Sequence, residues 1–189
     1  FMSKLKAGNI KKGIYVLHNG KPHYVTKTQF VSPGKGSAFT RAKLQNLRSG
    51  ATIEFTFKSH DSVEELDVES RELQFLYNMD DEVVFMDPRS YEQTNVSVSL
   101  LDGKEKFLVP ELNVYIQLYE DKAIGVKFAP KVKIEVTEAE DAVAGDRQNA
   151  GKKPVVMETG LVVQAPLFVK KGESLLIDTE TGAYLSRSN

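Results

Sequence analysis

Apolar and polar residues alternate through much of this chain, and turn-forming residues interrupt the alternation at short intervals. A period of two matches a β-strand with one face in a core, whereas no long stretch has the 3.6-residue period of an amphipathic helix. The alternation is clear in 133–137, and short apolar segments recur at 14–17, 73–77 and 160–165. We therefore predict an all-β protein.

An Asn19-Gly20 dipeptide separates two short apolar segments near the start of the chain. Asn-Gly is the strongest short signal for a two-residue β-hairpin loop, because both residues tolerate a positive φ. Pro22 follows, which favours an edge strand or a slightly longer loop. His18 and His23 flank the turn, where we expect exposed polar side chains.

Two breaks divide the alternating pattern into three β modules. The segment 59–65 is polar and rich in turn-forming residues, and Pro130 cannot continue a central strand. We therefore expect domains over residues 1–65, 66–129 and 130–189. The first is predicted to be a five-stranded barrel-like module, and the other two are predicted to be five-stranded OB-type barrels.

Two expected strands of the first module, 53–57 and 38–44, differ in the residues that alternate along them: apolar residues in the first and basic residues in the second. Ile53, Phe55 and Phe57 alternate with polar residues and are predicted to face the core. Arg41 and Lys43 alternate with apolar residues, so we expect them to share the outward face of their strand.

The second and third modules contain further expected strands around clear turns. These strands are 73–77, 82–86, 112–118, 123–128, 133–137, 155–157, 160–165, 174–178 and 183–185. Between 138 and 154 the alternation is lost. A polar segment of this length in a small domain is typical of a functional or mobile loop.

Charge is segregated along the chain. Residues 1–65 contain 11 Lys and Arg against 4 Asp and Glu, a net charge of +7. Residues 66–129 contain 6 against 13, a net charge of −7, and residues 130–189 contain 8 against 9. A basic segment beside an acidic one indicates a polyanion partner for the basic part. Lysines that only confer solubility are the alternative explanation.

The sequence contains no pattern of a catalytic or metal centre. His18, His23 and His60 lack the spacing of metal ligands, and the segment 34–36 lacks the Ser or Thr and the helix of a phosphate-binding loop. The absence of cysteine fits a reducing compartment, and no apolar segment reaches the about 18 residues that a membrane span needs. We expect a cytoplasmic protein without catalytic residues, metal, other cofactor or membrane partner.

Lys35 stands between two glycines in the segment 30–39, FVSPGKGSAF. A strand cannot continue through Pro33 and Gly34, and Gly34 and Gly36 allow a tight protruding turn with Lys35 at its tip. We therefore predict a loop that is shaped by Pro33, Gly34 and Gly36 and presents an amine, either to solvent or to a partner.

Seven sequence blocks follow one another in a fixed order. They are FVSPGKGSAF at 30–39, KLQNLRSG at 43–50, FTFKS at 55–59, SYEQ at 90–93, TGLVV at 159–163, APLFV at 165–169 and GAYLSR at 182–187. Together they closely resemble bacterial translation elongation factor P over the whole chain. The resemblance implies an SH3-like (KOW-type) first domain followed by two OB-fold domains. It also implies a factor that binds the ribosome beside the P-site tRNA and relieves stalling at consecutive prolines, by positioning the acceptor end of the peptidyl-tRNA.

The resemblance also assigns site residues. Lys35 matches the position that usually bears a lysyl-type or aminopentanol-type extension, added by a lysine-modifying enzyme. Gly145 and Asp146 match a third-domain loop that approaches the E-site codon or small-subunit RNA, and Arg147 stands where a threonine is usual. Tyr184 and Arg187 match the closing block of the family and are expected to contact RNA, with packing and a local ion pair as the alternative role. Independently of the resemblance, charge and strand placement predict RNA contacts at Arg41, Lys43 and Arg48, with ordinary solvated surface residues as the alternative.

The expected partners are the ribosome between its P and E sites, the P-site peptidyl-tRNA and the lysine-modifying enzyme, and we expect a monomer. Two alternatives stay open. The first is a general RNA-binding or RNA-chaperone OB protein that grips single strands, although the chain contains no tryptophan for stacking. The second is a specialised paralogue of elongation factor P.

Overall fold

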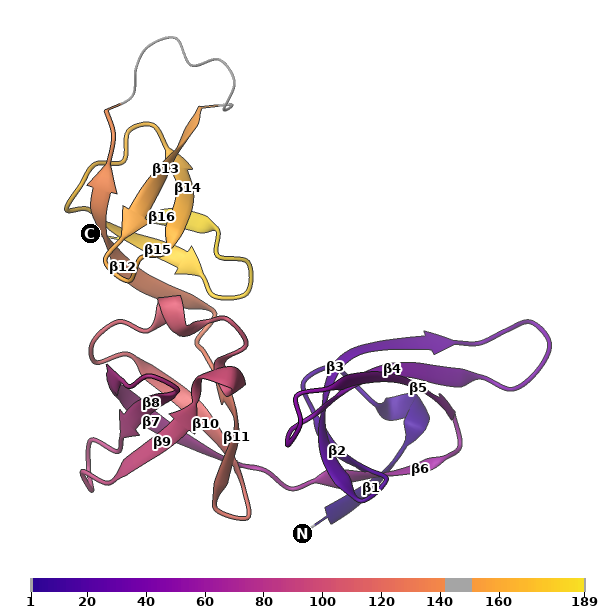
Figure 1. Cartoon of the computed structure of the whole chain (residues 1–189). Helices are drawn as coiled ribbons and strands as arrows, with labels where there is room; N and C mark the ends of the chain where they lie inside the picture. The colour runs from indigo at the N-terminus through magenta and orange to yellow at the C-terminus, as the bar shows by residue number, and fades with distance from the viewer. Residues whose placement is uncertain (1, 142–150, 189) are drawn as a thin grey trace. The chain divides into compact units, whose positions relative to one another are not determined.

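The computed structural model describes residues 2–141 and 151–188. These residues form sixteen strands and three short 3-10 helices, and the strands make three sheets (Figure 1). The prediction of an all-β protein with three β domains is confirmed. The chain divides into two compact units, Phe1–Ser70 with Gln117–Ile124, and Arg71–Ile116 with Gly125–Asn189. The domain limits at 65/66 and 129/130 stay a prediction.

The first sheet has six strands in the order β1-β6-β2-β3-β4-β5. They are β1 (Met2–Lys6), β2 (Tyr15–His18), β3 (Lys21–Val31), β4 (Phe39–Asn46), β5 (Thr52–Lys58) and β6 (Ser62–Leu66), with a 3-10 helix η1 (Ala7–Asn9) after β1. The buried side chains inside this sheet are Ala7, Ile10, Val16, Val25, Ala42, Leu44, Phe57 and Val63.

The first sheet has one strand more than the five that we expected. Of the segment 59–65, which we interpreted as turn, only the first part is a turn, and β6 begins at Ser62. Val63 and Leu66 are buried, and β6 pairs with both β1 and β2. Its sequence, SVEEL, has too few apolar residues for the alternation to be visible.

The β2–β3 hairpin confirms the Asn-Gly prediction. Asn19 and Gly20 form a two-residue loop with φ of 50° and 69°. The expectation for Pro22 is wrong, because β3 lies inside the sheet and the loop is short. Pro22 is tolerated because the β3–β4 pairing begins one residue later, with His23 opposite Asn46.

His18 and His23 are buried rather than exposed, at 9% and 4% of their surface. The tight turn keeps both strands in the sheet up to its first residue, so the flanking side chains pack inward. The two imidazole rings lie 5.6 Å apart, and that of His18 also contacts the ring of Phe55. Burial lowers the pKa of His18, and the charge of His23 lowers it further.

β5 only partly follows its predicted orientation. Phe57 is buried, as expected, but Ile53 and Phe55 are 42% and 40% exposed. β5 is the edge strand of the first sheet, so no further strand covers its open side. The core prediction is therefore right for Phe57 and wrong for Ile53 and Phe55.

Residues 117–124 belong to the first unit through a separate apolar cluster. Ile124 is buried together with Tyr15 and Leu66. Gln117 is also buried, and its Nε2 donates a hydrogen bond to the Ser70 hydroxyl at 2.9 Å.

The second and third sheets have five strands each, in the orders β11-β10-β7-β8-β9 and β14-β13-β12-β15-β16. In each of these sheets the strand that comes first in the chain, β7 or β12, lies between the second and the fourth strands of that sheet. The second and third sheets therefore have the same topology. In the third sheet β14 and β16 also lie against each other, which closes it toward a barrel. The strands of the second sheet are β7 (Glu69–Asn78), β8 (Glu82–Met86), β9 (Gln93–Ser97), β10 (Asn113–Tyr119) and β11 (Lys122–Lys127). Two 3-10 helices, η2 (Val98–Leu101) and η3 (Glu105–Phe107), connect β9 to β10. The third comprises β12 (Lys131–Ala139), β13 (Lys152–Met157), β14 (Val162–Pro166), β15 (Ser174–Asp178) and β16 (Tyr184–Ser188).

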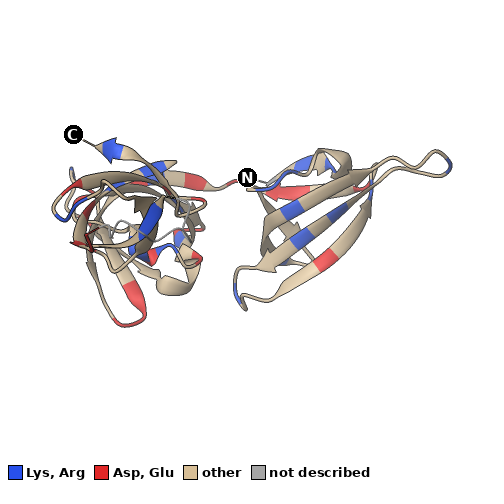
Figure 2. Ribbon diagram, turned by 90° about the horizontal axis from the view of Figure 1, so that it is seen from above, with Lys and Arg blue, Asp and Glu red and all other residues tan. Residues whose placement is uncertain are grey.

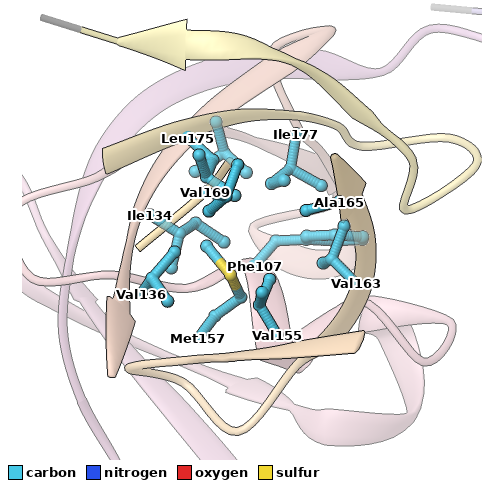
Figure 3. Close-up of a cluster of buried hydrophobic side chains, with 11 residues drawn as sticks. Phe107, Ile134, Val136, Val155, Met157, Val163, Ala165, Val169, Leu175 and Ile177 are labelled. Carbon is cyan, nitrogen blue, oxygen red and sulfur yellow. The ribbon is translucent and has the colours of Figure 1, made fainter. Parts of the chain in front are cut away.

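Every strand expected in the second and third modules has a counterpart, whereas β9 was not predicted. A cluster of apolar side chains forms the third-sheet core, and Phe107 from η3 enters it beside Val155 and Val163 (Figure 3). Of the polar segment 138–154, residues 142–150 lie outside the described residues.

Candidate functional site

The longest hairpin of the first sheet carries Lys35. β3 and β4 pair from His23 and Asn46 out to Val31 and Phe39. The connecting loop, residues 32–38, extends beyond the rest of the first sheet, with a basic residue (blue) at its far end (Figures 1 and 2).

The glycines of this loop have different roles. Lys35 is exposed, as are the residues on both sides of it. Gly36 has a φ of +103°, which an L side chain rarely adopts, and it lies close to the Pro33 ring. Gly34 does not have a positive φ, and a Cβ there would meet no atom within 4 Å. Gly36 therefore shapes the turn, whereas the geometry at Gly34 accepts other residues.

The base of the loop is held by backbone hydrogen bonds. The Ser59 N–H donates to the Ala38 carbonyl at 3.0 Å, and the Ser59 carbonyl accepts from the Gly8 N–H at 3.2 Å. The loop thus projects from a fixed base formed by β3, β4, η1 and the residues after β5.

Two of the predicted RNA contacts lie on the outward face of the hairpin, as expected. Arg41 is exposed, and its Nε lies 3.5 Å from a Glu54 carboxylate oxygen. Lys43 is exposed and lies between Lys27 on β3 and Glu54 on β5 in the strand register. Lys27 is exposed too, so β3 and β4 present two like charges directly opposite each other.

Lys27 was not singled out from the sequence. A β-bulge between Val25 and Lys27 shifts the β3–β4 register. A bulge breaks the simple alternation that assigns side chains to faces, so the sequence pattern could not place this lysine beside Lys43.

Arg48 lies in the turn after β4, at the opposite end of the hairpin from Lys35. Its backbone N–H donates to the Asn46 side-chain oxygen at 2.8 Å, and its side chain is exposed. With a rise of about 3.3 Å per residue, β4 separates the two turns by roughly 23 Å. Basic residues therefore lie at the tip, middle and base of one hairpin.

The other predicted contacts belong to the second compact unit. Tyr184 is partly buried and packs against the third-sheet core. Arg187 donates from Nη1 to Glu173 Oε1 at 3.3 Å, and its guanidinium carbon lies 4.9 Å from the centre of the Phe168 ring. Phe168 lies in the block APLFV, but the sequence pattern indicated no role for it. Three predicted residues lie outside the described residues, namely Gly145, Asp146 and Arg147.

Residues 2–141 and 151–188 contain no group of three or more His, Asp or Glu side chains that could hold a metal ion. Among the described helices, none has the length and apolar character needed to cross a membrane.

Three family models match successive parts of the chain. They are described as Elongation factor P (EF-P) KOW-like domain, over residues 6–63, Elongation factor P (EF-P) OB domain, over 68–126, and Elongation factor P, C-terminal, over 132–187. A protein named elongation factor P from Treponema pallidum (strain Nichols) is 40% identical over 185 residues, which cover 98% of this chain and 99% of that protein. The chain belongs to the elongation factor P family. The elongation factor P of Desulfatibacillum aliphaticivorans is 37% identical over 183 residues, 97% of this chain and 98% of its own.

A solved structure titled eukaryotic translation initiation factor 5A, from Methanococcus jannaschii, is similar with a TM-score of 0.49 and 27% identity, over 68% of this chain and 92% of its own.

Membership of the elongation factor P family confirms the resemblance seen in the sequence blocks. The first sheet is the KOW-type, SH3-like domain, and the second and third sheets are OB folds. Elongation factor P is a translation elongation factor and not an enzyme, in agreement with our expectation. A factor of this kind has the ribosome as its partner.

Proposed function

We propose that this protein binds the ribosome beside the P-site tRNA and stimulates peptide-bond formation at consecutive prolines. Its contribution is to position the acceptor end of the peptidyl-tRNA, which lowers the entropic part of the barrier without adding a reacting group. The observation that carries the proposal is the exposed Lys35 at the tip of a loop with a hydrogen-bonded base, in a chain of the elongation factor P family.

The Lys35 amine is the proposed site of a lysyl-type or aminopentanol-type extension. Its exposure gives a modifying enzyme access to the amine, and the open space around Gly34 leaves room beside it. An extension would lengthen the reach of the loop toward the acceptor end while its base stays held at Ala38.

The basic residues of the hairpin are proposed to contact RNA phosphates along its length. Residues 1–65 carry a net charge of +7, which attracts a polyanion at long range. Arg41, Lys43 and Arg48 lie exposed on that segment. For the third domain we propose contacts of Gly145, Asp146 and Arg147 with the E-site codon or small-subunit RNA, and of Tyr184 and Arg187 with nearby RNA. We also propose that the factor acts as a monomer with domains 1–65, 66–129 and 130–189.

The decisive experiment measures the rate of Pro-Pro-Pro synthesis in a reconstituted translation system that lacks the factor. The protein is purified from its native host, so that any extension on Lys35 is retained. We expect acceleration that is specific for proline runs and is lost in Lys35→Ala.

Two controls make the result interpretable. Lys122→Ala removes an exposed lysine from the start of β11 and should keep full activity. Lys35→Arg keeps the charge but removes the amine that an extension needs, so it separates charge from modification. Full activity of a correctly folded Lys35→Ala protein would refute the proposal.

A further inference from the structure

The loop between β14 and β15 presents an exposed aromatic side chain on a firm base. Val169 is fully buried in the third-sheet core (Figure 3), whereas its neighbour Phe168 is 55% exposed. The Val169 N–H donates to the Pro166 carbonyl at 3.1 Å, so the loop is fixed on both sides of the phenylalanine. An exposed phenylalanine by itself is ordinary. Its contacts are the informative part.

Glu173 organises the surroundings of Phe168 by bonding in two directions. Its Oε2 accepts from the Lys170 backbone N–H at 2.8 Å, which closes the turn. Its Oε1 accepts from Arg187 Nη1 at 3.3 Å, and the Arg187 guanidinium carbon lies 4.9 Å from the Phe168 ring centre. The ring and the guanidinium are therefore held together before any ligand arrives.

The backbone hydrogen bond from Lys170 lowers the pKa of Glu173, and Arg187 contributes to the same shift. Glu173 thus stays ionised at neutral pH and keeps Arg187 in place.

The charge around the ring is positive. Lys170 and Lys171 follow Phe168 on the same loop and are exposed. Arg187, which pairs with Glu173, adds a third cation and lies over one face of the Phe168 ring, which is 55% exposed. An exposed aromatic ring beside cations is the combination with which proteins bind single-stranded nucleic acid, because a base stacks on the free ring face while its phosphates meet the cations.

We propose that Phe168, Arg187, Lys170 and Lys171 form a binding site for single-stranded RNA, with one base stacked on Phe168 and the adjacent phosphates at the lysines. A duplex keeps its bases stacked inside and cannot offer a free base face to this ring. The site rests on the RNA contact proposed above for Arg187 and does not involve Lys35, so a loss of RNA binding in Phe168→Ala and a loss of proline-specific acceleration in Lys35→Ala are separate outcomes.

The absence of tryptophan from the chain allows a direct test. Phe168→Trp introduces a single tryptophan at the proposed stacking position, and its fluorescence is followed in the full-length protein during titration with an oligoadenylate RNA of about ten nucleotides, within the usual site size. We expect saturable quenching by the single strand and none by a duplex of the same length. Tyr91→Trp is the matched control, since Tyr91 is 72% exposed in the acidic middle segment and should show no quenching.

A second measurement uses Phe168→Ala, whose affinity for the same RNA should fall about tenfold, a typical loss for one stacked base. Lys170→Ala combined with Lys171→Ala should weaken the dependence of affinity on salt. Equal quenching by the duplex, equal quenching at Trp-substituted Tyr91, or unchanged affinity of Phe168→Ala would overturn the site. Weaker ribosome binding by Phe168→Ala with unchanged RNA affinity would identify a protein contact instead, and would overturn it too.

Discussion

The imidazole ring of His18 and the phenyl ring of Phe55 lie 4.5 Å apart between their centroids, on the inner side of the first sheet. A buried imidazole in an aromatic environment is easier to keep neutral than to charge. The pKa of His18 is accordingly lowered below its ordinary 6.5, first by burial and second by the charge of His23.

This shift predicts that the protein loses stability in mild acid. The folded-state pKa of His18 lies below the unfolded-state value, so the unfolded chain binds the proton more readily. The stability that neutral His18 confers is complete above the unfolded pKa of about 6.5 and decreases as the pH falls below it. Thermal unfolding between about pH 7.5 and 5 measures the effect. We expect His18→Phe to reduce this dependence, and His60→Phe, at an exposed turn, to leave it as it is. The same pH dependence in His18→Phe would refute the assignment.

The two glycines around Lys35 are predicted to respond differently to alanine. Gly36→Ala forces a φ of +103° on an alanine. It should lower the free energy of unfolding by about 1 kcal/mol, or change the conformation of the turn that carries Lys35. Gly34→Ala meets no atom within 4 Å and has no positive φ, so its stability should stay within about 0.5 kcal/mol of the parent. The unfolding temperature and the acceleration of Pro-Pro-Pro synthesis are compared for both. Equal losses in the two variants would contradict the geometry.

The comparison of sequence and structure shows where local patterns are sufficient. The Asn19-Gly20 turn follows from residue chemistry alone, because a two-residue loop needs positive φ at both positions. The alternation of 133–137 likewise reappears as the buried and exposed sides of β12.

Features that depend on neighbouring strands could not be predicted. The exposure of Ile53 and Phe55 follows from the edge position of β5, which is a property of the whole sheet. The pairing of Lys27 with Lys43 depends on a bulge, and the contact of Arg187 with Phe168 joins strand β16 to the loop between β14 and β15. Lys35 was found because its glycine-flanked tip is a local signal.

The facing lysines of β3 and β4 are predicted to lower the stability of the free protein. Lys27 and Lys43 are opposite each other in the register, and the Glu54 carboxylate beside Lys43 is already within 3.5 Å of Arg41. Lys27→Gln should therefore stabilise the fold by roughly 0.5 kcal/mol at low salt, and less at high salt, where the repulsion is screened. Unfolding at two salt concentrations measures this, with Lys122→Gln as a control away from the pair. If Lys27→Gln does not stabilise the fold at low salt, the side chains of Lys27 and Lys43 point away from each other and the predicted repulsion is absent.

Phe107 gives the largest predicted change in stability. It belongs to η3, between β9 and β10, yet its side chain is only 7% exposed and packs among the core residues of the third sheet (Figure 3). Removal of a buried phenyl group costs about 3–5 kcal/mol, because both the transfer free energy and the packing around the cavity are lost. Phe107→Ala should therefore lower the unfolding temperature by roughly 10 °C. Phe168→Ala removes the same phenyl group from a position that is 55% exposed. The unfolding temperature should therefore fall by only about a tenth to a third of the decrease in Phe107→Ala. Similar losses in the two variants would show that Phe107 does not hold η3 to the third-sheet core.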